Sequence, residues 1–351
     1  MNFVFDVPGR FAPHCALRAA AAACLLALAA CGGGDRVSTF APQRLIVLGD
    51  EASVIAGGDL IDVDGNTIAA QSGARYTVNA PQLDAAGAPL ATLNCSAFPI
   101  WVQSVANRYG FGFAECNPTP AVAPRGKIYA QVGAGTADIG AQVARVLADI
   151  GAFSSTDLVT VMAGQRDILD AYAQYPTLSG GEVVLLAGAA GSALGAQVNA
   201  LARADARVLI ATLPNQGGTP FAAAQNLVSG ERAALLKSMT EAYNTGLRAT
   251  IINDGRLIGL VQADEQLQFG LNNPAAFGYA SVSVGACSTP TAISCLAPTA
   301  AVGTTVPATP GTLVAGASVG SHLWADDLHF GPDAHARIGN LAVTRATNNP
   351  F

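Results

Sequence analysis

The sequence predicts an α/β protein built on a mostly parallel sheet. Five short runs rich in Leu, Ile and Val have the length of buried strands, and they span residues 44–48, 127–132, 157–161, 207–211 and 256–260. Helical patterns separate several of these runs. Strands that are buried on both faces and alternate with helices are typical of a parallel sheet covered by helices. Ligands of such sheets bind beyond the carboxyl ends of the strands, which is where we expect a site.

The helices of this sheet are predicted from periodicity and from helix-start signals. Residues 139–150 carry apolar side chains at i, i+4, i+7, i+8 and i+11, which lie on one face of a helix. A second helix is expected over residues 231–251, between the fourth and fifth strands. A closing helix is expected to start at Gly331-Pro332-Asp333 and to run through His335, because proline is favoured in the first turn of a helix.

Composition alone is compatible with a membrane protein, since 51% of the 351 residues are hydrophobic and only 12% are charged. The clean apolar run near the N-terminus, residues 19–30, is twelve residues long, whereas a spanning helix needs about 20. A chain this rich in Val, Leu and Ile is not disordered. A formal net charge of −6 argues against a nucleic-acid partner. We therefore expect an acidic globular protein.

The first 31 residues have the pattern of an export signal. Arg10 and Arg18 precede the apolar run 19–30, which ends in Leu28-Ala29-Ala30-Cys31. This ending resembles a bacterial lipobox, in which the thiol of the cysteine receives diacylglycerol and small residues precede it. An ordinary secretory signal with an incidental Cys31 is the alternative. We expect an exported lipoprotein on the periplasmic face of the outer membrane or at the cell surface, held to the membrane by Cys31.

The chain is expected to contain one folded domain. The predicted segments are a signal peptide at 1–30, a lipidated cysteine with its tether at 31–43 and the domain at 44–351, with insertions near 51–126 and 266–325. Residues 288–321 read as a long surface loop, and a lid, a spacer or a loop without function all fit it. Residues 62–66 resemble part of a calcium loop but lack the downstream glutamate, so we expect a plain turn. No metal or cofactor is predicted.

Cysteine usage agrees with export. Three of the seven cysteines lie in the first 31 residues, and the other four are Cys95, Cys116, Cys287 and Cys295. Four cysteines allow three pairings, among which local loops favour Cys95–Cys116 and Cys287–Cys295. Disulfides persist in oxidising compartments outside the cytoplasm. A zinc site is a weak rival, because the sequence has no C-x-x-C motif and its histidines lie elsewhere.

The histidines are candidates for a catalytic base. The three beyond the leader, His322, His329 and His335, lie within fourteen residues of one another. Asp326 stands three residues before His329, and a carboxylate at that spacing can reach the imidazole and fix its tautomer, which is how a catalytic base is oriented. Taken alone, the D-x-x-H motif favours a surface histidine near a helix N-cap.

Four short motifs between residues 44 and 345 follow one another in the order and spacing of a known family. The matching residues are Gly49-Asp50-Glu51-Ala52-Ser53 for the first motif, Gly133 for the second, Gly164-Gln165-Arg166-Asp167 for the third, and Asp326, His329 and His335 for the last. In this order the chain resembles the SGNH, or GDSL, hydrolases. The resemblance implies a flavodoxin-like three-layer sandwich, hydrolysis of carboxylic esters and a cleft for a small acyl ester or a similar ligand.

Two departures fall on the residues that the family uses for chemistry. Glu51 stands at the position of the nucleophilic serine, and Arg166 stands at the position of the asparagine that, with a backbone amide and Gly133, stabilises the oxyanion. Glu51 cannot form the same acyl-enzyme, and its carboxylate brings negative charge to the place where negative charge must develop. The resemblance therefore implies a weak or silent esterase that keeps His329 and Asp326.

Three hypotheses for Glu51 remain open in the sequence. Glu51 could pair with Arg166 and fill the oxyanion hole. It could act as a carboxylate nucleophile, with the covalent ester cleaved by water that His329 and Asp326 activate. Ser53 could instead serve as a displaced nucleophile, although two residues along a helix rotate by about 200°. The ion pair corresponds to a silent esterase relative, and either nucleophile, Glu51 or Ser53, corresponds to an active ester hydrolase. A ligand-binding or structural envelope lipoprotein is a separate alternative.

Overall fold

The computed structural model describes residues 40–117, 123–300, 307–309, 311–349 and 351. The predicted signal peptide, Cys31 and most of the tether lie outside the described residues, so the lipid anchor stays a prediction from the sequence. Part of the 288–321 loop also lies outside them.

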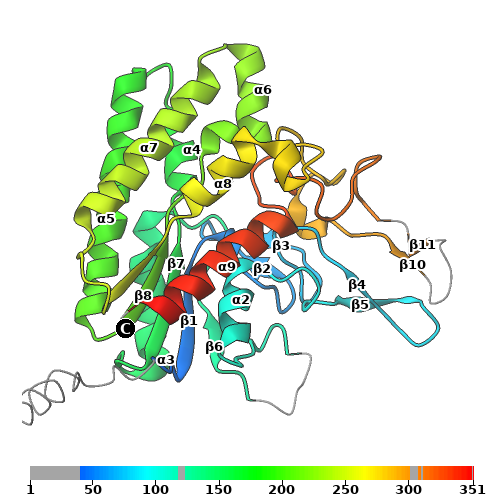
Figure 1. Ribbon diagram of the computed structural model, residues 1–351, viewed down its shortest axis with the longest axis horizontal. Coiled ribbons are helices and arrows are strands. Elements are labelled where there is room, and N and C mark those ends of the chain that lie inside the picture. The colour runs from blue at the N-terminus through cyan, green and yellow to red at the C-terminus, as the bar shows by residue number, and fades with distance from the viewer. Residues whose placement is uncertain (1–39, 118–122, 301–306, 310, 350) are drawn as a thin grey trace, which may run out of the picture. The chain divides into compact units, whose positions relative to one another are not determined.

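A five-stranded parallel sheet forms the centre of the domain (Figure 1). Its strands are β1 (Arg44–Gly49), β6 (Gly126–Ile128), β7 (Asp157–Met162), β8 (Arg207–Ala211) and β9 (Ile258–Val261), in the order β6-β1-β7-β8-β9. Every neighbouring pair is parallel. Counted along the chain this order is 2-1-3-4-5, the flavodoxin-like order. The predicted fold class and all five predicted strands are therefore confirmed.

The bounds of two predicted strands were wrong. The second strand ends at Ile128 rather than at residue 132, because Tyr129 N and Ala130 N both donate to Val47 O, at 2.8 and 3.0 Å, and this breaks the regular ladder. The fifth strand begins at Ile258 rather than at residue 256. Arg256 lies in a turn instead, where its backbone N–H donates to the Asp254 carboxylate at 2.9 Å.

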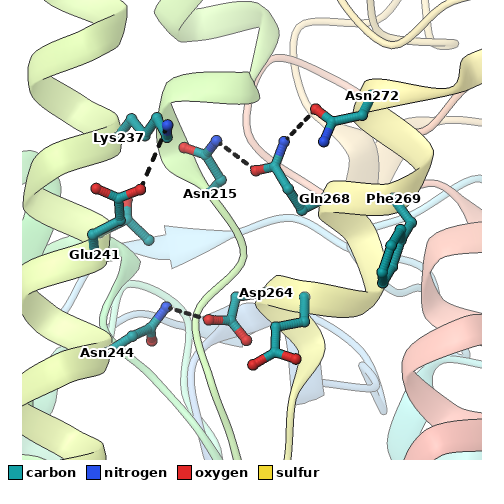
Figure 2. A pocket seen from close by; sticks show the side chains of 10 residues that line it. Asn215, Lys237, Glu241, Asn244, Asp264, Gln268, Phe269 and Asn272 are labelled. Carbon is teal, nitrogen blue, oxygen red and sulfur yellow. Dashed lines mark hydrogen bonds and ion pairs between the residues drawn. The ribbon is translucent and has the colours of Figure 1, made fainter.

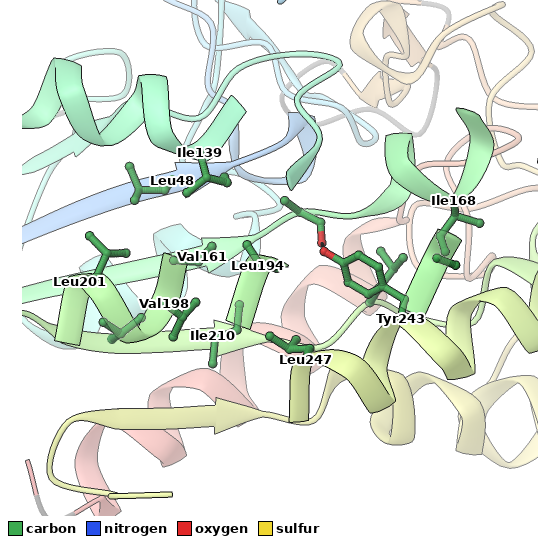
Figure 3. Packing of buried hydrophobic residues seen from close by; sticks show 14 of the residues in the cluster. Leu48, Ile139, Val161, Ile168, Leu194, Val198, Leu201, Ile210, Tyr243 and Leu247 are labelled. Atoms are coloured by element: carbon green, nitrogen blue, oxygen red, sulfur yellow. Dashed lines mark hydrogen bonds between the residues drawn. The ribbon is translucent and has the colours of Figure 1, made fainter. Parts of the chain in front are cut away.

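Helices cover both faces of the sheet. One face packs on α3 (Ile139–Ile150), α4 (Gln165–Tyr172), α5 (Gly180–Arg203) and α7 (Arg232–Thr250), and the other packs on α2 (Trp101–Arg108), α8 (Ala263–Asn272) and α9 (Pro332–Asn348). Neighbouring strand residues alternate between the two cores, as a pleated sheet requires. Figure 3 shows the first core, where Leu48, Val161 and Ile210 of the strands meet Ile139, Leu194 and Val198 of the helices. These layers form the expected three-layer sandwich.

Helix α5 escaped the sequence analysis because glycine and alanine interrupt its apolar pattern. Its glycines allow close packing on α7: a Cβ on Gly191 would lie 1.9 Å from Tyr243 O. With 24 residues and a mean hydropathy of 1.4 over its most apolar window, α5 is also the one described helix long and apolar enough to cross a membrane. Its buried residues, among them Leu194 and Val198, pack in the first core, which is the setting of a core helix.

The remaining elements are short and lie mostly in the two predicted insertions. They comprise α6 (Pro220–Val228), the 3-10 helices η1 (Glu51–Ser53), η2 (Thr136–Asp138), η3 (Gln216–Gly218), η4 (Pro274–Phe277) and η5 (Ala292–Ser294), and the strands β2 (Leu60–Ile61), β3 (Thr67–Ile68), β4 (Pro81–Leu83), β5 (Pro89–Leu93), β10 (Thr299–Ala300) and β11 (Pro307–Thr309). The turn between β2 and β3 is the plain turn expected at 62–66, since Asp62 Oδ1 accepts from the backbone N–H groups of Asp64 and Asn66.

Each of the two predicted insertions contains one disulfide. Cys95 pairs with Cys116, and Cys287 pairs with Cys295, so the pairing that local loops favour is confirmed. The second disulfide closes the loop that carries η5, and the backbone N–H of Ala292 in η5 donates to Asp326 Oδ2 at 2.7 Å. The insertion at 266–325 therefore helps to hold one of the predicted site residues.

Candidate active site

The predicted site residues gather at the carboxyl ends of the strands. Glu51 follows β1, Gly133 lies in the loop after β6, and Arg166 follows β7 at the start of α4. The end of β1 can approach β7 because Gly49 has a φ of +131°, and a Cβ there would lie 1.9 Å from Met162 O. The gap between β1 and β7 is the point where the strand order reverses, the usual ligand position in such sheets.

His329 and Asp326 form the pair that the sequence predicts. His329 Nδ1 lies 2.8 and 2.9 Å from the two carboxylate oxygens of Asp326. Asp326 Oδ1 also accepts from the backbone N–H groups of Leu328 and His329, at 3.0 and 2.8 Å, so the carboxylate is held from several sides. The ring of Tyr76 lies 4.9 Å from the His329 ring, centroid to centroid. The imidazole is thus fixed in the orientation of a catalytic base.

Glu51 fills the place where this base would meet a substrate. Its Oε1 lies 3.4 Å from His329 Nε2, and its Oε2 accepts from the backbone N–H of Gly133 at 2.9 Å. Gly133 N–H is the group that the family resemblance assigns to the oxyanion hole. The carboxylate of Glu51 therefore occupies the hole itself and stands where the oxyanion of a reacting ester would form.

The predicted ion pair between Glu51 and Arg166 is wrong. Arg166 Nη1 lies 3.0 Å from Asp64 Oδ2 and donates to Gly133 O at 2.9 Å, and Arg166 Nε lies 3.2 Å from Asp170 Oδ2. The turn between β2 and β3 brings Asp64 to the guanidinium, and the imidazole of His329 takes the place of Arg166 as the partner of Glu51. Glu51 fills the oxyanion hole, as the ion-pair hypothesis expected, but the positive group beside it is His329 rather than Arg166.

The charges of this group follow from burial and from the contacts between its members. Burial lowers the pKa of His329, but its hydrogen bonds and charge interactions with Asp326 and Glu51 outweigh burial and raise the pKa to about 10. Burial raises the pKa of Asp326 and of Glu51, yet the imidazolium brings Asp326 to about 2 and lowers the pKa of Glu51 as well. At neutral pH the site is therefore a carboxylate–imidazolium–carboxylate cluster.

Asp50 is buried beside Glu51. Burial, together with the negative charge of Glu51, raises the pKa of Asp50 well above its ordinary value. Its Oδ1 accepts from the backbone N–H of Ala52 at 3.1 Å, which caps η1 and fixes the turn that carries Glu51. Asp50 thus shapes the local backbone that carries Glu51.

Little room is left at this site. The cavity beside Glu51 and His329 has a volume of about 10 Å³ and is also lined by Tyr76, Leu213 and Phe330. A cavity needs about 10–15 Å³ to hold one water molecule. An acyl ester does not fit unless the side chain of Glu51 leaves.

Ser53 does not belong to the site, which corrects the third hypothesis. Its side chain is 0% exposed, and its Oγ accepts from Trp101 Nε1 at 3.1 Å. The hydroxyl therefore stabilises the packing of α2 beneath η1, and a substrate cannot reach it.

The other two histidines also lie outside the catalytic group. His335 is buried in α9, where its Nδ1 accepts from Trp101 N at 3.4 Å, and burial together with the charge of Arg75 lowers its pKa to about 3. His322 makes a 2.9 Å contact with Ser321 Oγ. His335 is a neutral core residue despite its place in the family motif.

The sequence did not identify two residues that support the site, Gln165 and Asp64. Gln165 Nε2 donates to Leu328 O at 3.1 Å and to Gln216 Oε1 at 3.2 Å, which ties the start of α4 to the loop that carries His329. Asp64 pairs with Arg166 from 102 positions away. Gln165 could have been found from its place beside Arg166 in the third motif, whereas no sequence signal links Asp64 to Arg166.

Removal of Arg166 is expected to change stability little. The Arg166 side chain is 33% exposed, and its partners Asp64 and Asp170 are more exposed still. Exposed ion pairs contribute about 0–1 kcal/mol. We expect Arg166→Ala to lower the free energy of unfolding by less than about 1 kcal/mol in urea titrations. A loss above about 3 kcal/mol, the cost of breaking a buried pair, would contradict the exposed pairing described here.

Comparisons with known proteins concern the fold. No protein-family model and no curated protein matches the chain. Similar solved structures include Axe2, an acetylxylan esterase from Geobacillus stearothermophilus, at 12% identity over 88% of this chain and 96% of that chain, with a TM-score of 0.40. Another is LAE5, an alpha/beta hydrolase from the metagenome of Lake Arreo, at 13% identity over 87% and 95% of the two chains, with a TM-score of 0.40.

A third similar structure is a putative GDSL-like lipase from Parabacteroides merdae, at 8% identity over 87% of this chain and 96% of that chain, with a TM-score of 0.38. The flavodoxin-like sheet observed here is the fold that the resemblance of the sequence motifs implies. Because identities and TM-scores are this low, the chemistry of the site has to be derived from the residues of this chain alone.

Proposed function

We propose that this chain is an exported, lipid-anchored protein of the SGNH-hydrolase type whose ester-hydrolase site is silent. One observation carries the proposal: the Glu51 carboxylate lies 3.4 Å from His329 Nε2 and 2.9 Å from the Gly133 backbone nitrogen. A single side chain thereby stands at the nucleophile position, contacts the nitrogen of the base and fills the oxyanion hole.

The protonation state supports a silent site as strongly as the missing serine does. Ester hydrolysis by this kind of site needs a neutral imidazole that can take a proton. His329 has a pKa of about 10 and lies between two ionised carboxylates, so at neutral pH it has no free lone pair. The charge of Glu51 also opposes the oxyanion, whose stabilisation by one donor is worth about 10²–10³ in rate.

Catalysis through Glu51 as a nucleophile finds less support. That route needs a water molecule activated by a neutral His329, and it needs a substrate within reach of the carboxylate. The imidazolium cannot activate water, and the cavity of about 10 Å³ holds at most about one water molecule. A ligand-binding role for this cleft would likewise require Glu51 to move, whereas a structural role in the cell envelope requires no change at the site.

The test is an assay of the purified wild-type protein on p-nitrophenyl acetate and p-nitrophenyl butyrate. We expect no hydrolysis above the rate of the His329→Ala variant, because the imidazolium contributes no general base. Wild-type turnover that His329→Ala abolishes would overturn the proposal and restore the active hydrolase.

The membrane anchor is tested separately. If Cys31 carries the lipid, expression in a bacterial host should place the wild-type protein in the membrane fraction, with the mass increase of an acylated N-terminal cysteine. The Cys31→Ser variant should lose both the mass increase and the membrane association, and Cys24→Ser serves as the matched control. An unchanged distribution of the Cys31→Ser variant would favour an ordinary secretory signal.

A further inference from the structure

A second cleft lies beyond the carboxyl ends of β8 and β9, between α7 and α8 (Figure 2). Its volume is about 290 Å³, near the lower end of the range for small-molecule sites, about 300–1,000 Å³. None of its lining residues lines the cavity beside Glu51. The loop after β8 links the two sites: Asn244 of the cleft exchanges hydrogen bonds with the backbone of Leu213, which lines the cavity beside Glu51, and Gln216 in the same loop accepts from Gln165.

Side-chain amides form a connected chain along one wall of this cleft. Asn215 Nδ2 donates to Gln268 Oε1 at 3.0 Å, and Gln268 Nε2 donates to Asn272 Oδ1 at 2.9 Å. At its inner end the chain is anchored to backbone, because Asn215 Oδ1 accepts from Gly217 N at 2.9 Å. At its outer end Asn272 is exposed, and its Nδ2 has no acceptor among the described residues. The chain therefore presents oriented amide donors to the cleft from fixed positions.

An exposed aromatic ring stands beside the amides. Phe269 follows Gln268 on α8, and 61% of its surface is exposed. Figure 2 shows its ring on the α8 side of the cleft, next to the residues of the amide chain. An apolar ring exposed to water next to oriented hydrogen-bond donors suits a ligand that has both an apolar face and hydroxyl groups.

The charges around the cleft disfavour an anionic ligand. Lys237 Nζ lies 3.5 Å from Glu241 Oε1, and Arg248 pairs with both Asp264 and Glu265, at 2.8 and 3.3 Å. Every cation here has a carboxylate partner, so no free positive charge is left to hold an anion. Three carboxylates, Glu241, Asp264 and Glu265, stand against these two cations, so the cleft is net negative and its carboxylates can accept from the hydroxyl groups of a neutral ligand.

We propose that this cleft binds a neutral saccharide. A pyranose ring offers a face of C–H groups that can stack on Phe269, and its hydroxyl groups can accept from Asn272 and donate to the Glu241 carboxylate. Hydroxyl groups both donate and accept hydrogen bonds. A ligand with several hydroxyl groups therefore suits a wall of amides and carboxylates better than a purely apolar or a singly charged ligand does. The proposal is independent of the silent site, because it involves no turnover and none of the residues around Glu51.

The test is a titration of the ¹⁵N-labelled full-length protein, followed through its side-chain amide signals. The probes are the neutral disaccharides cellobiose, maltose and N,N′-diacetylchitobiose, with digalacturonic acid as the anionic comparison. We expect at least one neutral disaccharide to bind with a Kd of about 1 mM and to shift the amide signals of Gln268 and Asn272. Phe269→Ala should weaken that binding at least about tenfold, which corresponds to one stacked aromatic contact.

Leu227→Ala is the matched control, because Leu227 is 90% exposed on α6 and does not line the cleft, and it should leave binding unchanged. Gln268→Leu should also weaken binding, and a native amide spectrum of each variant shows that it still folds. The proposal is overturned if no neutral disaccharide shifts these signals at about 20 mM, if digalacturonic acid binds more tightly, or if Phe269→Ala binds as the wild type does. None of these results bears on hydrolysis at the Glu51 site.

Discussion

The Glu51→Ser/Arg166→Asn double variant is expected to hydrolyse p-nitrophenyl acetate at least about 10²-fold faster than the wild type. Serine at position 51 restores a nucleophile within reach of His329 and removes the carboxylate from the Gly133 backbone nitrogen. Loss of Glu51 also removes one of the two anions that raise the pKa of His329, which returns the imidazole toward the neutral form. Asparagine at position 166 restores a second oxyanion donor in place of a guanidinium that pairs with Asp64.

Two controls make this result specific. Glu51→Gln/Arg166→Asn removes the same charge and keeps a side chain of the same size but offers no hydroxyl nucleophile, so it should stay inactive. Addition of His329→Ala to the active double variant should remove the gain, because the base that takes the serine proton is then lost. If the double variant stays as slow as the wild type while its fold is unchanged, Glu51 is not what silences the site.

Stability is expected to fall as the pH rises from 7 toward 10. The folded-state pKa of His329 is about 10, above the ordinary histidine value of 6.5. A raised folded-state pKa gives stability that is fully present below the unfolded pKa of 6.5 and is lost as the pH rises through 10. Between these values the native state holds one more proton than the unfolded state. The free energy of unfolding should therefore decrease by up to about 1.4 kcal/mol per pH unit.

The matched variant for this prediction is His329→Gln, which keeps a polar side chain but cannot titrate. Urea unfolding at pH 7, 8 and 9 should show the decrease in the wild type and a flatter profile in the variant. Of the other groups facing His329, Asp326 and Glu51 have lowered pKa values and burial raises the pKa of Tyr76. The pKa of Asp50 is raised as well, but Asp50 is present in both proteins, so the difference between the two slopes reports on His329. Equal slopes in the two proteins would show that His329 is not held as an imidazolium.

Local sequence patterns were sufficient to predict the sheet and three of its helices. The strands are short runs of bulky apolar residues, and α3, α7 and α9 have either clear periodicity or a proline start. Helix α5 was missed because Gly191, Gly195 and several alanines interrupt its buried apolar face, where the glycines allow close contact with α7. Tertiary packing outweighs helix propensity there.

At the site, contacts close in sequence were predictable and distant ones were not. Asp326 and His329 are three residues apart, so their pairing follows from local geometry. The partner of Glu51 depends on how loops from different strands meet. Opposite charge and the positions that the family resemblance implies favoured Arg166, but Asp64 pairs with the guanidinium and Glu51 contacts His329 instead. Ser53 was misjudged for a related reason, because its burial against Trp101 depends on the packing of α2.

The most direct test of the silent-site account is the protonation of His329 itself. Nitrogen and proton NMR of the imidazole, with His329→Gln used for assignment, can follow its titration in the folded wild-type protein. The account predicts an imidazolium at pH 7 that titrates with a pKa of about 10. An imidazole that is neutral at pH 7 and titrates near 6.5 would contradict it, because His329 would then be free to act as a base.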